Sequence, residues 1–159
     1  MLPALAPYFA AVTIICLLIV ALEDVARMRI RNSMVVATVL AFVGYRIAGV
    51  GALPDGALLV AGSLFAFSLA CWALGLVGGG DAKFLPVCGL FAGVGDIAPM
   101  IFLLSAGSLV LVLVYFGLRP LARSGLAVPA FAHRYVERGK LPFGVAMAFA
   151  CAGILPAAA

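Results

Sequence analysis

Long apolar blocks without charged residues alternate with short polar segments along the whole chain. Within the blocks, apolar and polar residues do not alternate as they do in the strands of a membrane barrel. Nor do apolar residues recur every three to four positions, as in a helix with one face in water. Most of them reach the roughly 20 residues that an α-helix needs to cross a bilayer core about 30 Å thick. We therefore expect an all-α fold in one domain over residues 1–159, a polytopic membrane bundle of six transmembrane helices near residues 5–22, 33–50, 56–77, 82–95, 97–118 and 141–159.

The fourth block is shorter than the others. Its charge-free part covers residues 84–95, and twelve residues of α-helix rise only about 18 Å. The segment is therefore either a re-entrant or protein-buried helix, or a crossing that begins near Ala82 and lets Lys83 reach the membrane interface.

The distribution of Lys and Arg favours six crossings. Lys and Arg that flank membrane spans are retained in the cytoplasm. Six crossings put every basic residue except Arg46 on one side, whereas five crossings would divide them between the two sides. We expect both termini outside and cytoplasmic loops at residues 23–32, 78–83 and 119–140, the last with an interfacial helix.

Composition supports a membrane protein and excludes several other classes. Hydrophobic residues make up 67% of the chain and charged residues 10%, too little charge to coat a soluble domain. The net charge is +4, but the chain has no basic segment with aromatic residues interspersed, as nucleic-acid binding proteins often have. We therefore expect no nucleic-acid partner. The four cysteines form no C-x-x-C pair, so we interpret them as small hydrophobic residues and not as metal ligands.

Three of the six acidic residues gather at the expected inner face: Glu23, Asp24 and Asp81. Asp81 follows a run of three glycines at 78–80, which weakens a helix unless the backbone must approach another group closely. Asp81 is then either the N-cap of the fourth helix or a functional group. Two neighbouring carboxylates share a proton and can act as general base and general acid on a water that attacks a peptide carbonyl, without cofactor or metal.

Three motifs resemble those of the GxGD-type prepilin peptidases. The run from Gly78 to Lys83 resembles the family's G-x-G-D-x-K signature. Asp24, with Ile30 six and Asn32 eight residues later, resembles its first catalytic segment, although many members have Pro where this chain has Arg31. The run at 140–146 is similar to the Pro-aromatic-Gly entry to the family's last span. The added cytoplasmic region of the larger members, commonly with two C-x-x-C pairs, is absent, as in the short peptidase-only branch of tight-adherence (Flp-type) pilus systems.

This resemblance implies an aspartic endopeptidase in the bacterial inner membrane, with its active site facing the cytoplasm. It would remove the basic leader of type IV pilin-like prepilins or pseudopilins, cutting after a glycine, without N-methylation. Its partners would be the prepilin, the lipid bilayer and the pilus assembly machinery. Asp24 and Asp81 would be the catalytic pair, and the expected supporting or substrate-binding residues are Gly78, Gly80, Lys83, Glu23 and Asn32.

Two roles and two other functions stay open. Lys83 either biases the proton of the aspartate pair or faces the lipid headgroups. Glu23 either accepts the positive charge of the leader or offsets Arg27 one helical turn on. The alternatives to a peptidase are a small transporter, which the lack of midplane charge disfavours, and a non-enzymatic subunit of a secretion or pilus assembly complex.

Overall fold

The computed structural model describes residues 3–49, 51–123 and 141–155. Within these ranges all regular secondary structure is helical, as predicted, and the elements are η1 (Pro3–Leu5), α1 (Ala6–Arg27), α2 (Asn32–Gly49), α3 (Ala57–Ala73), α4 (Gly79–Ala92), α5 (Ile97–Arg123) and α7 (Phe143–Ile154).

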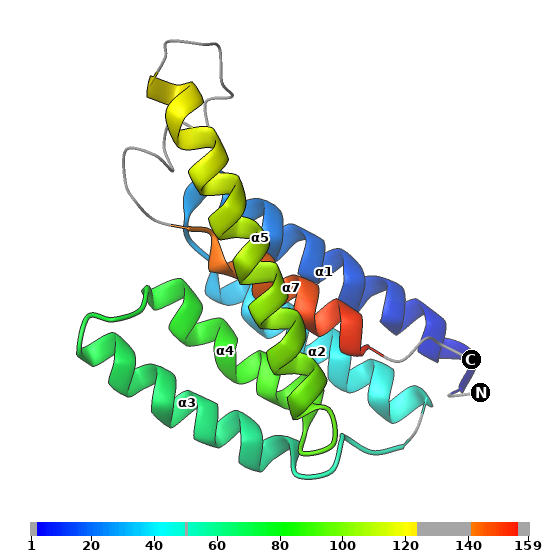
Figure 1. Ribbon diagram of the computed structural model, residues 1–159. Helices are drawn as coiled ribbons and strands as arrows, with labels where there is room; N and C mark the ends of the chain where they lie inside the picture. The colour runs from blue at the N-terminus through cyan, green and yellow to red at the C-terminus, as the bar shows by residue number, and fades with distance from the viewer. Residues whose placement is uncertain (1–2, 50, 124–140, 156–159) are drawn as a thin grey trace.

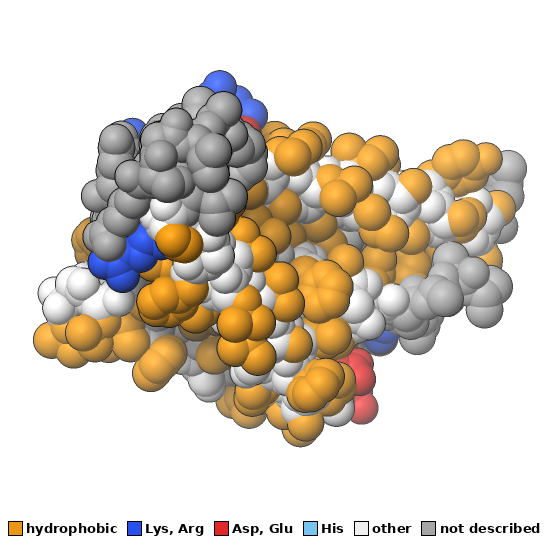
Figure 2. All heavy atoms as spheres, turned by 45° about the horizontal axis from the view of Figure 1, so that its top comes forward, with side chains coloured by type: hydrophobic (Ala, Val, Ile, Leu, Met, Phe, Trp, Pro, Cys, Tyr) orange, Lys and Arg blue, Asp and Glu red, His pale blue; other side chains and the backbone are white. Residues whose placement is uncertain are grey.

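The surface of the bundle is apolar. In the described part of the chain, three helical stretches are long and apolar enough to cross a membrane, namely Pro3–Arg27, Asn32–Gly49 and Ile97–Pro120. Ala57–Ala73 and Phe143–Ile154 are shorter apolar helices. Large hydrophobic side chains point outward, among them Leu58 at 73% and Phe102 at 71% exposure. Hydrophobic side chains cover most of the described surface in Figure 2. An apolar exterior of this extent is typical of a helical membrane bundle.

Helix α7 lies between α1, α4 and α5, and α3 pairs with α4 on the other side of the bundle (Figure 1). The core is formed mainly by side chains of α1, α2, α4 and α7, with Ala57 of α3 and Met100 of α5 at its edge. Its fully buried side chains include Leu17, Val20, Phe42, Phe84, Cys88 and Cys151. The rings of Phe42 and Phe91 stack with centroids 3.8 Å apart, which joins α2 to α4. The C-terminal end of α1 and the N-terminal ends of α2, α4 and α7 lie together on the left of Figure 1.

Several helices end away from the bounds expected from hydropathy. Helix α1 continues to Arg27 and stops at Met28, which has a left-handed backbone with φ 53°, so Glu23 and Asp24 lie on the helix and not in a loop. Helix α3 stops at Ala73 before the end of its apolar block. Helix α7 begins at Phe143 and ends at Ile154, and residues 156–159 of the expected span 141–159 lie outside the described residues. Of the predicted interfacial segment 119–140, α5 includes residues up to Arg123, and the rest lies outside the described residues.

Helix α4 is short, as its charge-free block indicates, but it begins earlier than expected. It covers Gly79–Ala92, 14 residues with Pro86 inside. Asp81 is therefore in its first turn and not in the preceding loop. Gly78 is the N-cap, with no side-chain hydrogen bond, so the interpretation of Asp81 as the N-cap is wrong.

Candidate functional site

Asp24 lies in the last turn of α1 and is buried, with 5% of its surface exposed. Its Oδ2 accepts a hydrogen bond of 2.7 Å from the backbone N–H of Gly144, in the first turn of α7. Backbone N–H groups in a first helical turn have no acceptor within their own helix. The N-terminal end of α7 therefore holds the Asp24 carboxylate, although the two residues are 120 positions apart.

Asp81 occupies the first turn of α4, where the helix dipole favours a carboxylate. Its side chain folds back toward the chain that enters the helix: a Cβ added to Gly78 would lie 3.1 Å from Asp81 Oδ2. A glycine at 78 thus leaves room for the Asp81 carboxylate, which gives the glycine run a local physical reason.

The two predicted motifs contact each other directly. Gly80 packs against the backbone of Ile30, since a Cβ at Gly80 would lie 3.4 Å from Ile30 N. Lys83 Nζ donates a hydrogen bond of 3.0 Å to Asn32 Oδ1, a contact that neither expected role of Lys83 included. The turn between α1 and α2 is therefore joined to the first turns of α4, and the segments that carry Asp24 and Asp81 share one end of the bundle.

Glu23 has a different partner from the one expected. Its carboxylate forms an ion pair with Arg31 and not with Arg27. Glu23 Oε2 is buried and, within the described part of the chain, has no hydrogen-bond partner. Arg31 thus provides the counter-ion of a buried glutamate, at the position where many members of the resembled family have Pro.

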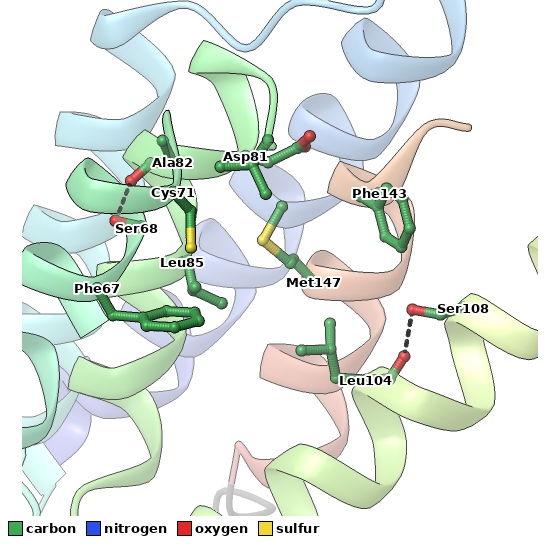
Figure 3. Close-up of a pocket in the computed structure, with 11 residues that line it drawn as sticks. Phe67, Ser68, Cys71, Asp81, Ala82, Leu85, Leu104, Ser108, Phe143 and Met147 are labelled. Atoms are coloured by element: carbon green, nitrogen blue, oxygen red, sulfur yellow. Dashed lines mark hydrogen bonds between the residues drawn. The ribbon is translucent and has the colours of Figure 1, made fainter. Parts of the chain in front are cut away.

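A groove of about 180 Å³ lies beside Asp81, between α3, α4, α5 and α7. It is lined by Phe67, Ser68, Cys71, Val77, Asp81, Ala82, Leu85, Leu104, Ser108, Phe143 and Met147. In Figure 3 the Asp81 carboxylate points from α4 toward the side of α7, where Phe143 lies.

The two hydroxyls of the groove donate to backbone carbonyls. Ser68 Oγ lies 2.9 Å from the carbonyl oxygen of Ala82, and Ser108 Oγ 2.7 Å from that of Leu104 (Figure 3). The groove therefore offers mostly apolar surface with one carboxylate at its side, a combination that suits an apolar chain segment next to a reacting polar group.

Two features of the site region were not selected from the sequence. The Pro-aromatic-Gly motif was recognised, but Gly144 was not singled out as a site residue. Cys88 and Cys151 were interpreted as isolated, whereas their sulfur atoms lie 3.5 Å apart and link α4 to α7. No three His, Cys, Asp or Glu side chains in the described ranges cluster so that they could hold a metal ion.

Comparison with known proteins identifies one family. A sequence model described as the type IV leader peptidase family matches residues 11–116, two thirds of the chain. The match includes Asp24, Asn32 and the run from Gly78 to Lys83, and it ends before Gly144. No curated protein and no solved structure matches the chain.

Proposed function

Because the chain belongs to the type IV leader peptidase family, we propose that it is an aspartic endopeptidase whose catalytic pair is Asp24 and Asp81. The family is one of proteases that act on type IV prepilins, and the finer assignment rests on the site. The observation that carries it is the contact between the two motifs, through Gly80 and Ile30 and through Lys83 and Asn32. These contacts tie both aspartate segments to one end of the bundle.

The proposed reaction is a direct hydrolysis with two carboxyl groups. The ionised carboxylate takes a proton from water while the water oxygen attacks the carbonyl carbon of the scissile peptide bond. The protonated carboxyl gives its proton to the carbonyl oxygen, and a proton then passes to the leaving amine as the C–N bond breaks. The products are a leader with a new carboxylate and a mature chain with a new amine, and no covalent intermediate forms on the protein.

The groove supports a substrate with an apolar segment directly after the cleavage point. A prepilin has this form, with a basic leader followed by an apolar helix. Asp81 and Phe143 both line the groove, so an apolar segment placed there begins beside Asp81 and beside the helix end whose Gly144 N–H binds Asp24. A glycine before the scissile bond lets the substrate backbone approach the carboxylates closely, which supports cleavage after glycine.

Charge supports the proposed placement in the membrane. Arg27, Arg29, Arg31 and Lys83 belong to the segments at the end of the bundle that carries the aspartates, and Arg46 lies in the last turn of α2. We propose that the aspartate end faces the cytoplasm of a bacterial inner membrane, with six crossings and both termini outside. The lack of C-x-x-C pairs supports the short branch that serves Flp-type pili and performs no N-methylation.

The test is co-expression with an Flp-type prepilin, followed by the size of the pilin on a gel. Asp24→Ala and Asp81→Ala should each leave the precursor uncleaved, as should the nearly isosteric Asp24→Asn and Asp81→Asn. Asp96→Ala, an exposed acid in the turn before α5, is the matched control and should cleave normally. Normal cleavage by either the Asp24→Ala or the Asp81→Ala variant would refute the proposed catalytic pair.

A further inference from the structure

Only glycine fits at position 144 while Asp24 keeps its observed place. A Cβ built on Gly144 would lie 2.8 Å from Asp24 Oδ2, 2.9 Å from its Cγ and 3.0 Å from its Cβ. Carbon atoms in proteins do not approach backbone or side-chain atoms this closely without displacement. Any side chain at 144 must therefore move the Asp24 carboxylate, which has little free space because it is buried.

The hydrogen bonds at the start of α7 explain why the Gly144 N–H is available to Asp24. The N–H of Phe143 donates to the carbonyl of Leu141 at 3.0 Å, and the N–H of Val145 donates to that of Pro142 at 3.1 Å. Between them, the N–H of Gly144 donates to Asp24 Oδ2. The Asp24 carboxylate thus takes the place of a capping side chain for α7.

The electrostatic setting of Asp24 makes this donor important. Asp24 lies in the C-terminal turn of its own helix, where the dipole disfavours an anion. The N-terminal end of α7 supplies the opposite field together with a direct N–H donor. A hydrogen bond to the charged form of a carboxylate favours that form.

We propose that Gly144 is the positioning residue that orients Asp24 in the aspartate pair, a step that rests on the proposed function. Its N–H engages Oδ2 and so leaves Oδ1 to hold the attacking water. The absence of a side chain at 144 lets α7 approach α1 closely enough for this contact. The preceding residue, Phe143, lines the groove with Asp81, so one helix end both orients Asp24 and forms a wall of the groove.

The first experiment is a kinetic comparison of Gly144→Ala with Gly117→Ala on purified full-length protein in liposomes. Gly117 lies in α5 and has open space around the added Cβ, so its variant is the matched control. Alanine keeps the N–H and favours helix more than glycine does, so the variant tests the added Cβ and not the helix propensity of α7. Gly144→Ala should lower kcat at least tenfold with KM for the prepilin within twofold, whereas Gly117→Ala should change neither.

The outcomes separate this inference from the proposed function. A kcat of Gly144→Ala within twofold of the parent protein, while Asp24→Ala is inactive, would overturn the inference and leave the proposed function intact. A raised KM with an unchanged kcat would make Gly144 a substrate contact and would also overturn it. Full activity of Asp24→Ala would instead refute the proposed function.

A second measurement depends neither on activity nor on the folding of a Gly144 variant. Hydrogen exchange of the Gly144 amide is followed in the full chain, in the parent protein and in Asp24→Ala, Asp24→Asn and Asp81→Ala. Asp24→Ala removes the acceptor and should speed exchange of this amide at least tenfold. Asp24→Asn keeps an acceptor oxygen and should preserve the protection of the amide. Asp81→Ala, which does not touch this hydrogen bond, should preserve it as well. Equal exchange in Asp24→Ala and the parent would overturn the inference.

Discussion

Lys83 Nζ donates a hydrogen bond of 3.0 Å to Asn32 Oδ1, which joins the second turn of α4 to the first residue of α2 across 51 positions of sequence. Asn32 and Lys83 are the last residues of the two motifs that contain the aspartates. With the packing of Gly80 on Ile30, the bond holds both motifs in a common arrangement. The aspartates are thus supported by polar and steric contacts between helices as well as by apolar packing.

The Lys83–Asn32 bond predicts coupled effects on activity. Both groups are exposed, so its loss should change the free energy of unfolding by only about 1 kcal/mol. Lys83→Met and Asn32→Ala should each lower leader cleavage several-fold, and the double variant should be no worse than the more impaired single variant. The cleavage rates of the parent protein, the two single variants and the double variant, measured side by side, form a double-mutant cycle. Multiplicative losses in the double variant would contradict the coupling.

The glycine run predicts different tolerance at adjacent positions. Alanine at 78 would bring its Cβ to 3.1 Å from Asp81 Oδ2, whereas alanine at 79 would only contact Trp72 Nε1 at 3.5 Å. Gly78→Ala should therefore reduce cleavage about tenfold, which corresponds to about 1.4 kcal/mol of transition-state stabilisation. Gly79→Ala, the matched control, should stay within twofold of the parent protein. Equal activity of the two variants would show that Asp81 does not need the space over Gly78.

The groove predicts a defect in substrate binding. Ser108 lines it from α5, and the neighbouring Leu109 is 59% exposed on the outside of the bundle. Ser108→Phe should fill the groove and raise KM for the prepilin with little change in kcat, because the carboxylates keep their positions. Leu109→Phe adds a ring of the same size outside the groove and should leave both parameters unchanged. A prepilin KM unaffected by Ser108→Phe would exclude the groove as the place of the substrate's apolar segment.

The ion pair between Glu23 and Arg31 predicts an asymmetric effect on stability. Glu23 is buried, whereas the side chain of Arg31 is 57% exposed. Arg31→Ala leaves a buried carboxylate without its counter-ion, but Glu23→Gln leaves an arginine that water can solvate. Thermal unfolding in detergent should show Arg31→Ala to be the less stable variant, by about 1–3 kcal/mol. The reverse order would mean that the pair does not compensate the burial of Glu23.

The thiols of Cys88 and Cys151 predict a cross-link between α4 and α7. Their sulfur atoms are 3.5 Å apart in the core, about 1.5 Å more than a disulfide bond requires. Both thiols are fully buried and therefore react slowly, so prolonged treatment with the membrane-permeant oxidant diamide should convert them to a disulfide as the helices open locally. Each thiol gives up one hydrogen, and the N=N bond of diamide takes up both. Intact mass should fall by two hydrogens in the parent protein and in Cys16→Ser, but not in Cys88→Ser or Cys151→Ser. A loss of two hydrogens that persists in Cys88→Ser or Cys151→Ser would show that other thiols pair, and would contradict the contact between α4 and α7.

Much of the fold was predictable because the bilayer imposes simple rules. Apolar blocks long enough to cross hydrocarbon must form helices, since every backbone polar group needs a partner within the segment. The all-α bundle and the short fourth helix follow from this rule. Helix ends were less predictable: α3 stops at Ala73, and Gly75 follows with φ 73°, because a turn can be as apolar as the helix before it.

The sequence by itself determined the helical class, the family motifs and the selection of Asp24 and Asp81, because charge is scarce and each charged residue stands out. Only the tertiary structure decided which groups meet. It paired Glu23 with Arg31 in place of Arg27, brought Cys88 to Cys151, and set Gly144 against Asp24. The physical reason is that helical periodicity tells which side chains share a face of one helix, whereas contacts between helices depend on how those helices rotate and approach when their side chains pack.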